Sequence, residues 1–367
     1  MKVIAQTAAL QEAMNLTGSI VATRTPKPVL QCVKLVADGD TLTLLATDLE
    51  VGCRYQITAV QVEEPGEALI PADRLAGIVR ESGDDESLTI ETEKDASHVR
   101  GSASHFKVYG YDPGEYPEVA EFGDKPDFQV PAERLDAMIA KTLFATARAH
   151  SHYAISGVLW KASGKKLELV ATDGHRLALA KGALPKAAGK DISAIVPAKL
   201  MSMIQRVAGD AEETLDVRIT ENQVLIRTAR AVLVASLVQG NFPKYEDVIP
   251  REATRKASIG TEQFAHRIRQ AALLTNEESR GVRFSFAADK VTLSSRAPET
   301  GEAEVTCPVS FEGDPMEIGF NPSFLADVLK VVETDDISLE LTDPNKPALL
   351  TSGKDFLYVI MPVDLGQ

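Results

Sequence analysis

The sequence predicts an α+β protein made of three tandem copies of one domain, each about 125 residues long. A proline followed by an apolar helical pattern occurs as LIPADRLAGIVRE around Pro71, IVPAKLMSMIQRV around Pro197 and FNPSFLADVLKVV around Pro322, at spacings of 126 and 125 residues. The segment ATDLE at 46–50 also precedes ATDGH at 171–175 by 125 residues. Because separate landmarks share one period, a repeat explains them better than chance.

Each copy is expected to open with one helix and to contain a second helix after the repeated proline. The missing N–H of proline costs nothing at the first helical position, so the three prolines are expected there. Apolar residues at helical spacing mark the buried faces. In the opening helices these are Leu10, then Leu135, Met138 and Ile139, then Phe264 and Ile268. In the second helices they are Leu75, Ile78 and Val79, then Leu200, Met203, Ile204 and Val207, then Phe324, Leu325, Val328, Leu329 and Val332.

Strands joined by short turns are expected between the helices. Apolar and polar residues alternate from 51 to 57, which is typical of a half-buried strand. Hairpins are expected around Asp38-Gly39 and around Asn222. Proline, glycine and charged residues cluster near 123 and 252, which gives predicted domains of 1–123, 124–251 and 252–367.

Composition favours a protein that works in the cytoplasm. The first residues include Gln and Glu where a signal peptide needs an apolar run, and no stretch approaches the ~20 apolar residues of a membrane span. The three cysteines are widely spaced and form no CxxC pair, which disfavours a disulfide framework or a zinc cluster. The net charge of −14 argues against a simple nucleic-acid binder unless basic residues are concentrated in one region.

The segment ATDGHRLAL, residues 171–179, combines a carboxylate, an imidazole and a guanidinium, which are groups used in acid–base catalysis. Its first three residues recur at 46–48 without the histidine, so we expect Asp48 and Asp173 to bind backbone amides in equivalent tight turns. A hydrolase that uses Asp173 and His175 is the less favoured alternative, because no nucleophile motif accompanies them.

Other motifs of catalysis and cofactor binding are absent from the sequence. It has no GxSxG, no GxGxxG, and no Gly-Lys followed by Ser or Thr as in a phosphate-binding loop. His150 and His152 have strand-like spacing, but no further ligand lies at metal-binding spacing. We therefore expect no catalytic residue, no metal and no cofactor, and a protein that holds a partner rather than converts a substrate.

The chain resembles the bacterial replicative sliding clamp, the beta subunit of DNA polymerase III, from end to end. The resemblance rests on ATDGHRLAL, GNFPKYEDVIP (240–250), NEESRGVRF (276–284), GFNPSFLADVL (319–329) and YVIMPV (358–363), in this order and spacing. It implies a head-to-tail homodimeric ring whose channel is lined by helices. It also implies a non-enzymatic processivity factor of DNA replication, with duplex DNA, the polymerase catalytic subunit, a clamp loader and repair factors as partners.

A ring of this kind would account for the charge balance. Residues 1–123 carry a net charge of −10, residues 124–251 of +4 and residues 252–367 of −8. A modestly positive lumen attracts phosphates without reading sequence, and an acidic exterior repels DNA. Ordinary solvated helix surface is the alternative for each basic residue. The residues that the resemblance places near DNA are Arg24, Arg74, Arg134, Lys141, Arg148, Lys199, Arg206, Arg267 and Arg269.

The resemblance further implies a hydrophobic peptide-binding groove between the second and third domains. A short extended peptide would insert aromatic and aliphatic side chains there, so partners would compete for it. The alternative for single members is a core position at a domain junction. The implied groove residues are Ile155, Thr172, Gly174, His175, Arg176, Leu177, Pro243, Val248, Asn321, Phe324, Val359, Ile360, Met361, Pro362 and Val363.

The chain departs from the usual pattern of the family at the rim of this groove. Such clamps often end in a basic residue and leucine after MPM, whereas this chain ends MPVDLGQ, with Asp364 and the additional Gly366-Gln367. Asp247 stands where a basic residue can occur, and Ser279 where a bulky one can. We expect the more acidic rim to weaken the binding of acidic peptides. The other alternative to a clamp is a repeat scaffold that binds peptides but never DNA.

Overall fold

The structure, a computed structural model, describes residues 1–22, 24–123, 125–147, 153–207, 213–275, 281–297 and 301–365. These residues form two α-helices in each third of the sequence, as predicted. None of the described helices is long and apolar enough to cross a membrane. The helices are α1 (Thr7–Thr17), α2 (Ala72–Glu81), α3 (Ala132–Ala140), α4 (Ala198–Val207), α5 (Thr261–Ala272) and α6 (Pro322–Leu329).

By contacts between residues, the chain divides into two compact units. The first unit comprises Met1–Glu133, Leu184–Lys190 and Lys199–Leu237, and the second comprises Arg134–Ala183, Asp191–Ala198 and Val238–Gln367. The central third of the sequence is therefore shared between the two units. The physical reason is that strands of the central third belong to two different sheets.

The first unit contains two antiparallel sheets. The five-stranded sheet has the order β5 (Val60–Glu64), β1 (Lys2–Gln6), β7 (Ser87–Glu93), β8 (Ala96–Arg100) and β9 (His105–Tyr109). The eight-stranded sheet has the order β10 (Phe128–Pro131), β15 (Thr214–Ile219), β16 (Gln223–Arg227), β17 (Ala231–Ser236), β4 (Val51–Ile57), β3 (Thr41–Thr47), β2 (Cys32–Asp38) and β6 (Gly66–Pro71). The predicted hairpins around Asp38-Gly39 and Asn222 are confirmed as β2–β3 and β15–β16.

The second unit also contains two antiparallel sheets. The nine-stranded sheet has the order β14 (Ile192–Pro197), β11 (Gly157–Ser163), β12 (Lys166–Thr172), β13 (Arg176–Ala183), β26 (Phe356–Ile360), β25 (Ala348–Ser352), β24 (Asp336–Leu341), β18 (Arg255–Gly260) and β22 (Ser310–Glu312). The four-stranded sheet has the order β21 (Gly301–Pro308), β20 (Lys290–Ala297), β19 (Val282–Phe286) and β23 (Met316–Phe320).

The strand order confirms the threefold repeat. One four-strand set has the same order in each third: β6-β2-β3-β4, β14-β11-β12-β13 and β23-β19-β20-β21. The other set reads β1-β7-β8-β9, β10-β15-β16-β17 and β18-β24-β25-β26. Apart from the additional edge strands β5 and β22, the described residues of each third repeat one topology.

Neighbouring thirds join through backbone pairing. Strand β4 pairs with β17, with Cys53 opposite Leu233, and β13 pairs with β26, with Ala178 opposite Tyr358. Both members of the second pair lie 125 positions after those of the first, so the two junctions share one register. These junctions merge sheets of adjacent thirds, which is why the central third is divided between the two units.

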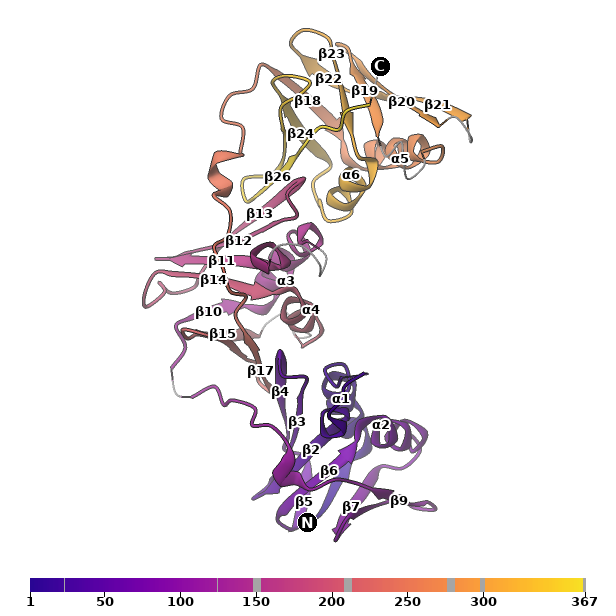
Figure 1. The fold of residues 1–367 in the computed structure, drawn as a ribbon, viewed down its shortest axis with the longest axis vertical. Helices are drawn as coiled ribbons and strands as arrows, with labels where there is room; N and C mark the ends of the chain where they lie inside the picture. Colours follow the sequence, from indigo (N-terminus) through magenta and orange to yellow (C-terminus); the bar gives the residue numbers. More distant parts are fainter. Residues whose placement is uncertain are drawn as a thin grey trace. The chain divides into compact units, whose positions relative to one another are not determined.

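The helices bury the faces that the sequence predicted. Helix α1 packs on α2 and β4, and α5 packs on α6, β20 and β21. Figure 1 shows α1 and α2 together beside the strands of the first unit. The predicted core side chains that are buried are Leu10, Leu75, Val79, Leu135, Met138, Ile139, Leu200, Met203, Ile204, Phe264, Ile268, Leu325, Val328 and Leu329. The ones that are half-buried are Ile78, Val207, Phe324 and Val332.

Two expectations about helix ends were wrong. Only Pro322 takes the first helical position, where Asn321 caps α6 by accepting a hydrogen bond from Ser323 N at 3.0 Å. Pro71 and Pro197 are instead the last residues of β6 and β14, because each strand passes into its helix without a linker. Helix α6 also ends at Leu329, so Val332 lies beyond it.

The cysteines are buried, free thiols in the described structure. Burial raises the pKa of Cys32 to about 11 and that of Cys53 to about 12. Both thiols therefore stay protonated at neutral pH and behave as small core residues rather than nucleophiles.

A segment after β9 packs on the eight-stranded sheet and ties two thirds together. Tyr116 is 7% exposed, and its hydroxyl donates to Cys32 O at 3.3 Å and accepts from Thr47 N at 3.0 Å. Burial raises the pKa of Tyr116 to about 12. The same cluster contains side chains of both thirds that share this sheet: Leu45, Leu69, Val119, Phe122, Leu225 and Val234.

Tyr116→Phe tests this anchor. The substitution leaves Thr47 N buried without its acceptor, so we expect a loss of about 1–3 kcal/mol in the free energy of unfolding of the first unit. Tyr109→Phe is the control, because Tyr109 is 72% exposed. Urea unfolding followed by circular dichroism measures both variants, and equal midpoints would contradict the assignment.

Candidate functional site

The ATD segments form the same turn twice. Asp48 Oδ1 accepts from Glu50 N at 3.1 Å and Val51 N at 2.8 Å. Asp173 Oδ1 accepts from His175 N and Arg176 N, both at 3.0 Å. The expectation of equivalent turns in which aspartate binds backbone amides is therefore confirmed.

The two turns differ at the tip. Gly174 has φ 89° and Leu49 has φ 78°, a left-handed conformation that glycine adopts freely and leucine does not. Leu49 is also 54% exposed. The glycine makes the second turn the unstrained version and leaves its surface free of a bulky side chain.

Arg176 is the centre of the second turn. Its guanidinium donates to Asp173 Oδ2 at 3.0 Å, Asp327 Oδ2 at 2.9 Å and Phe144 O at 2.8 Å, with only 10% of the side chain exposed. Burial opposes its charge, but the hydrogen bond that it donates to Asp327 and the attraction of Tyr358 and Asp173 raise its pKa above the ordinary value. A fixed cation is thus held where β13 begins, at one end of an interior strand of the sheet.

Phe324 lies over this cation. The guanidinium carbon of Arg176 is 4.5 Å from the Phe324 ring centroid, a cation–π distance. The exposed ring of His175 stacks near the same ring, with centroids 6.4 Å apart and planes at 23°. Phe324 stands 125 positions after Lys199, which pairs with Asp48 in the first unit. At the same repeat position, the first turn carries an ion pair and the second an aromatic surface.

The end of the chain runs past this surface. Met361 N donates to His175 O, and Val363 N donates to Gly319 O, both at 2.9 Å. Leu365 lies so close to Gly281 and Gly319 that a Cβ at either glycine would approach it within 3 Å. The tail is therefore fixed beside the turn, and Met361 keeps 38% of its surface exposed.

The fifteen groove residues all lie within the second unit. Those that keep exposed or partly exposed surface are Ile155, Gly174, His175, Arg176, Pro243, Val248, Asn321, Phe324, Met361, Pro362 and Val363, with Val248 47% exposed. Leu177, Val359 and Ile360 are 3, 2 and 0% exposed. These three belong to the core of the nine-stranded sheet, as the alternative for single members anticipated. Gly174 and Thr172 shape the turn, where Thr172 Oγ1 donates to Arg176 O at 2.7 Å.

Sequence reasoning missed the residues that hold Arg176. Asp327 and Phe144 were not predicted, and Asp173 was considered only as a turn residue or a base. Asp327 had a signal: it is the single charged residue in the segment FNPSFLADVL. Phe144 had none, because an aromatic residue after an amphipathic helix is also typical of a core position.

The nine predicted DNA-facing residues differ in how free they are. Arg148 lies outside the described residues. Lys141 donates to Glu333 at 3.2 Å, Arg267 donates to Gln270 at 2.9 Å, and Lys199 pairs with Asp48. The exposed members are Arg24, Arg74, Arg134, Arg206 and Arg269. Of these, Arg74 lies 3.5 Å from Asp73, and Arg134 donates to Ala183 O at 2.6 Å.

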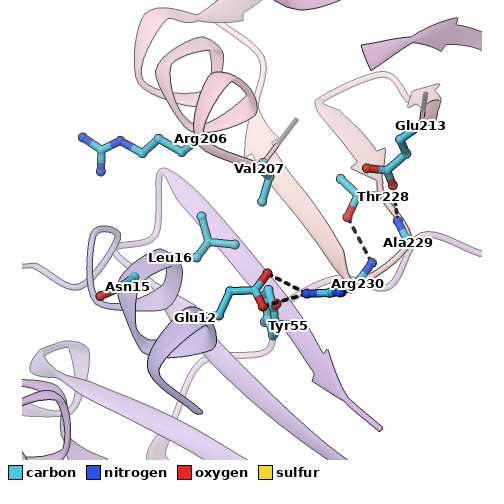
Figure 2. A pocket seen from close by; sticks show the side chains of 10 residues that line it. All are labelled: Glu12, Asn15, Leu16, Tyr55, Arg206, Val207, Glu213, Thr228, Ala229 and Arg230. Atoms are coloured by element: carbon cyan, nitrogen blue, oxygen red, sulfur yellow. Dashed lines mark hydrogen bonds and ion pairs between the residues drawn. The ribbon is translucent and has the colours of Figure 1, made fainter. Parts of the chain in front are cut away.

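A cavity of about 850 Å³ opens in the first unit between α1, β4, the end of α4 and the β16–β17 turn. Figure 2 shows that its polar groups largely satisfy one another: Arg230 pairs with both Glu12 oxygens, at 2.8 and 2.6 Å. Arg230 N also donates to Thr228 Oγ1 at 3.2 Å, while Arg206 points away from the cluster. We therefore assign the cavity a structural role. Among the described residues, no group of three or more His, Cys, Asp or Glu side chains is placed to hold a metal ion.

Comparisons with known proteins agree over the whole chain. Residues 1–120, 129–244 and 246–364 match the N-terminal, central and C-terminal domains of the DNA polymerase III beta subunit family. The beta sliding clamp of Pseudomonas putida is 32% identical over 362 residues, covering 98% of this chain and 99% of the relative. That of Caulobacter vibrioides is 31% identical over 371 residues, covering 99% and 100%.

Solved structures show the same fold. The DNA polymerase III subunit beta from Pseudomonas aeruginosa has a TM-score of 0.95 at 31% identity and covers 100% of both chains. The DNA polymerase sliding clamp from Bacillus subtilis has a TM-score of 0.95 at 27% identity and covers 99% of both. A further Pseudomonas aeruginosa sliding clamp, bound to griselimycin, has a TM-score of 0.95 at 30% identity and covers 100% of both.

Paired substitutions separate a structural turn from a catalytic pair. Asp173→Ala removes the acceptor of two backbone amides and one partner of buried Arg176, so we expect a loss of about 1–3 kcal/mol in the free energy of unfolding. His175→Ala changes an exposed side chain and should cost under about 0.5 kcal/mol. Chemical denaturation measures both. Similar losses for the two variants would contradict this division of roles.

Proposed function

We propose that this chain, which belongs to the bacterial DNA polymerase III beta subunit family, closes around duplex DNA as a head-to-tail homodimer. It is a beta sliding clamp, a non-catalytic subunit that confers processivity on DNA polymerase III. We also propose that it acts in the cytoplasm, with domain boundaries at 123/124 and 251/252. Its proposed partners are the polymerase catalytic subunit, repair factors and an ATP-driven loader, since its own sequence lacks a phosphate-binding loop.

The sheet repeat supports the dimer. Within the chain, β4 pairs with β17 and β13 pairs with β26, while the equivalent strands β21 and β9 are edges of their sheets. Exposed edges offer unpaired N–H and C=O groups. If β21 of one copy pairs with β9 of another, each copy supplies one edge of each seam. A head-to-tail interface of this kind closes into a ring when its rotation allows.

The register of the seam follows from the register inside the chain. In the β20–β21 hairpin, Pro308 lies opposite Lys290, the first residue of β20. In the β12–β13 hairpin, Ala183 lies opposite Lys166, the first residue of β12. Pro308 on β21 therefore corresponds to Ala183 on β13. In the same way, Tyr109 on β9 lies opposite Ala96, and Ser236 on β17 lies opposite Gln223. Tyr109 therefore corresponds to Ser236.

With the same register, Ala303 of one copy would lie opposite Phe106 of the second copy. Glu302 would then face Lys107, and Glu304 would face His105. This register follows from backbone pairing alone, so the pairing of acidic with basic or titratable side chains is independent support for the seam.

An apolar contact inside the chain supports the same seam. The Phe144 ring, just after α3, lies 5.9 Å from that of Tyr358 on β26. Leu273 follows α5 at the position matching Phe144, and Phe106 on β9 matches Tyr358. Leu273 is 78% exposed and Phe106 37% exposed in the single chain. Leu273 of one copy would therefore cover Phe106 of the second copy.

The groove around Arg176 and Phe324 supports peptide binding. It combines an aromatic face, an exposed methionine and the backbone of a chain end, which suits a short extended peptide with apolar anchors. Asp364 is exposed at the end of this tail, so the rim should disfavour acidic peptides relative to a basic rim.

Retention on circular DNA tests the ring. After loading with a compatible loader and ATP, we expect the clamp to remain on closed circles and to leave when the circle is cut, because a closed ring is held by topology and not by phosphate contacts. Equal retention on both forms would indicate ordinary electrostatic binding. No retention on either, with the loader active on a known clamp, would favour the peptide-binding scaffold.

Peptide titration tests the groove. We expect Phe324→Ala to weaken binding of a short acidic peptide with aromatic and leucine anchors by about 2 kcal/mol or more, since it removes the central apolar contact. Leu49→Ala, at the equivalent turn of the first unit, is the matched control and should bind as the wild type does. Asp364→Arg should tighten binding at low salt, and the gain should shrink at high salt. Equal affinities for all variants would contradict the groove.

A further inference from the structure

Two histidines on neighbouring strands share a hydrogen bond at the free edge of the five-stranded sheet. His98 Nδ1 on β8 lies 2.9 Å from His105 Nε2 on β9. The ring centroids are 5.2 Å apart and the planes differ by only 26°, so the rings meet edge to edge and not face over face. In this arrangement the two nitrogens point at each other and hold one proton between them. A metal ion bound by both nitrogens would have to separate them.

The pair is held from one side by a carboxylate of its own sheet. His98 Nε2 lies 3.9 Å from Glu93 Oε2 on β7, and the His98 side chain is only 13% exposed. His105 is exposed on the edge strand. A chain of groups therefore runs from Glu93 through His98 to His105 and ends at the sheet edge.

The other charges on this face are occupied. Glu91 on β7 pairs with Arg100 on β8, and Lys2 on β1 pairs with Glu63 on β5 at 2.7 Å. Lys107 on β9 lies 5.4 Å from the Tyr109 ring centroid. Glu91 lies directly opposite His98 but is already paired with Arg100, so within the single chain Arg100 and Lys107 disfavour a further positive charge on the histidine pair. Glu93, in contact with His98, is the unpaired carboxylate on this side that offsets them.

We propose that the ring seam contains a proton-binding site, formed by His98 and His105 of one copy and Glu304 of the second copy, and that closing the ring takes up a proton there. The inference rests on the proposed dimer, whose register places Glu304 directly opposite His105. Once closed, the histidine pair lies between two carboxylates, Glu93 on its own sheet and Glu304 across the seam. A carboxylate within ion-pair distance favours the protonated imidazole.

The sign of the pH effect follows from linkage. Closure favours the protonated pair, so protons favour closure. The dimer is expected to tighten as pH falls from 8 to 6, the range in which histidine changes charge. The gain is complete on the acidic side of this range and is lost as pH rises through it. Each exposed pair of this kind contributes little, but a closed dimer has two equivalent seams, so we expect about a 2- to 25-fold decrease in Kd.

The test measures Kd of the full-length protein by analytical ultracentrifugation from pH 6 to 8 at low ionic strength. Wild type, His105→Gln and Glu304→Gln are compared with His266→Gln, an exposed histidine on α5 that is not in the seam. The net charge of −14 becomes smaller at low pH and tightens any dimer, so the control defines this general slope. We expect wild type and His266→Gln to share the steep slope, and His105→Gln and Glu304→Gln to share a flatter one.

A second measurement counts the protons directly. Heats of dissociation on dilution, measured in buffers of different ionisation enthalpy, should show proton release by the wild type near pH 7 and less release by both seam variants. Dimers whose pH dependence is the same in all four proteins would overturn the proton site while leaving the ring intact. A flatter slope for His105→Gln alone would overturn the role of Glu304. Monomers at every pH and concentration would overturn the seam itself.

Discussion

Backbone pairing across the repeat boundaries is the constraint on which the rest of this structure depends. The repeats do not merely touch at side chains: β4 with β17, and β13 with β26, continue one hydrogen-bonded sheet from one third into the next. A strand edge is a periodic array, so a register error of one residue would send every side chain of the joined strands to the wrong face. The paired residues of the second junction lie 125 positions after those of the first, so both junctions have the same register.

The same constraint explains where function is located. Both junction turns use an aspartate to hold their backbone, so the turn itself is architecture. What distinguishes the second turn is a set of substitutions on an unchanged frame: glycine for Leu49, phenylalanine for Lys199, and an arginine held by two carboxylates. The first turn closes its surface with an ion pair. The second presents an aromatic ring beside a fixed cation, which is a surface that another chain can use.

The sequence alone predicted the repeat, the helix faces and the paired turns, because these depend on local spacing and on side chains that recur every 125 residues. It did not predict two compact units, since the choice of which strands lie side by side between thirds is a long-range pairing with no local signature. It also failed on Pro71 and Pro197, where strand and helix share a boundary residue. In the groove, apolar character alone did not separate Leu177 and Ile360, which are core, from Met361, which is exposed. The contacts of Arg176 with Asp327 and Phe144 join residues up to 151 positions apart, and no motif spans that distance.

The discontinuity of the first unit has a consequence for how the chain is made. Its eight-stranded sheet needs β17, which ends at Ser236, next to β4, which begins at Val51. During synthesis the β4 edge therefore stays unpaired until more than 230 residues have left the ribosome. In between, β13 emerges without its partner β26. Long-range pairing of this kind is slow and exposes sheet edges in the interim. The order in which the strands become available is thus set by translation, and the β4 edge offers unpaired backbone groups until β17 emerges.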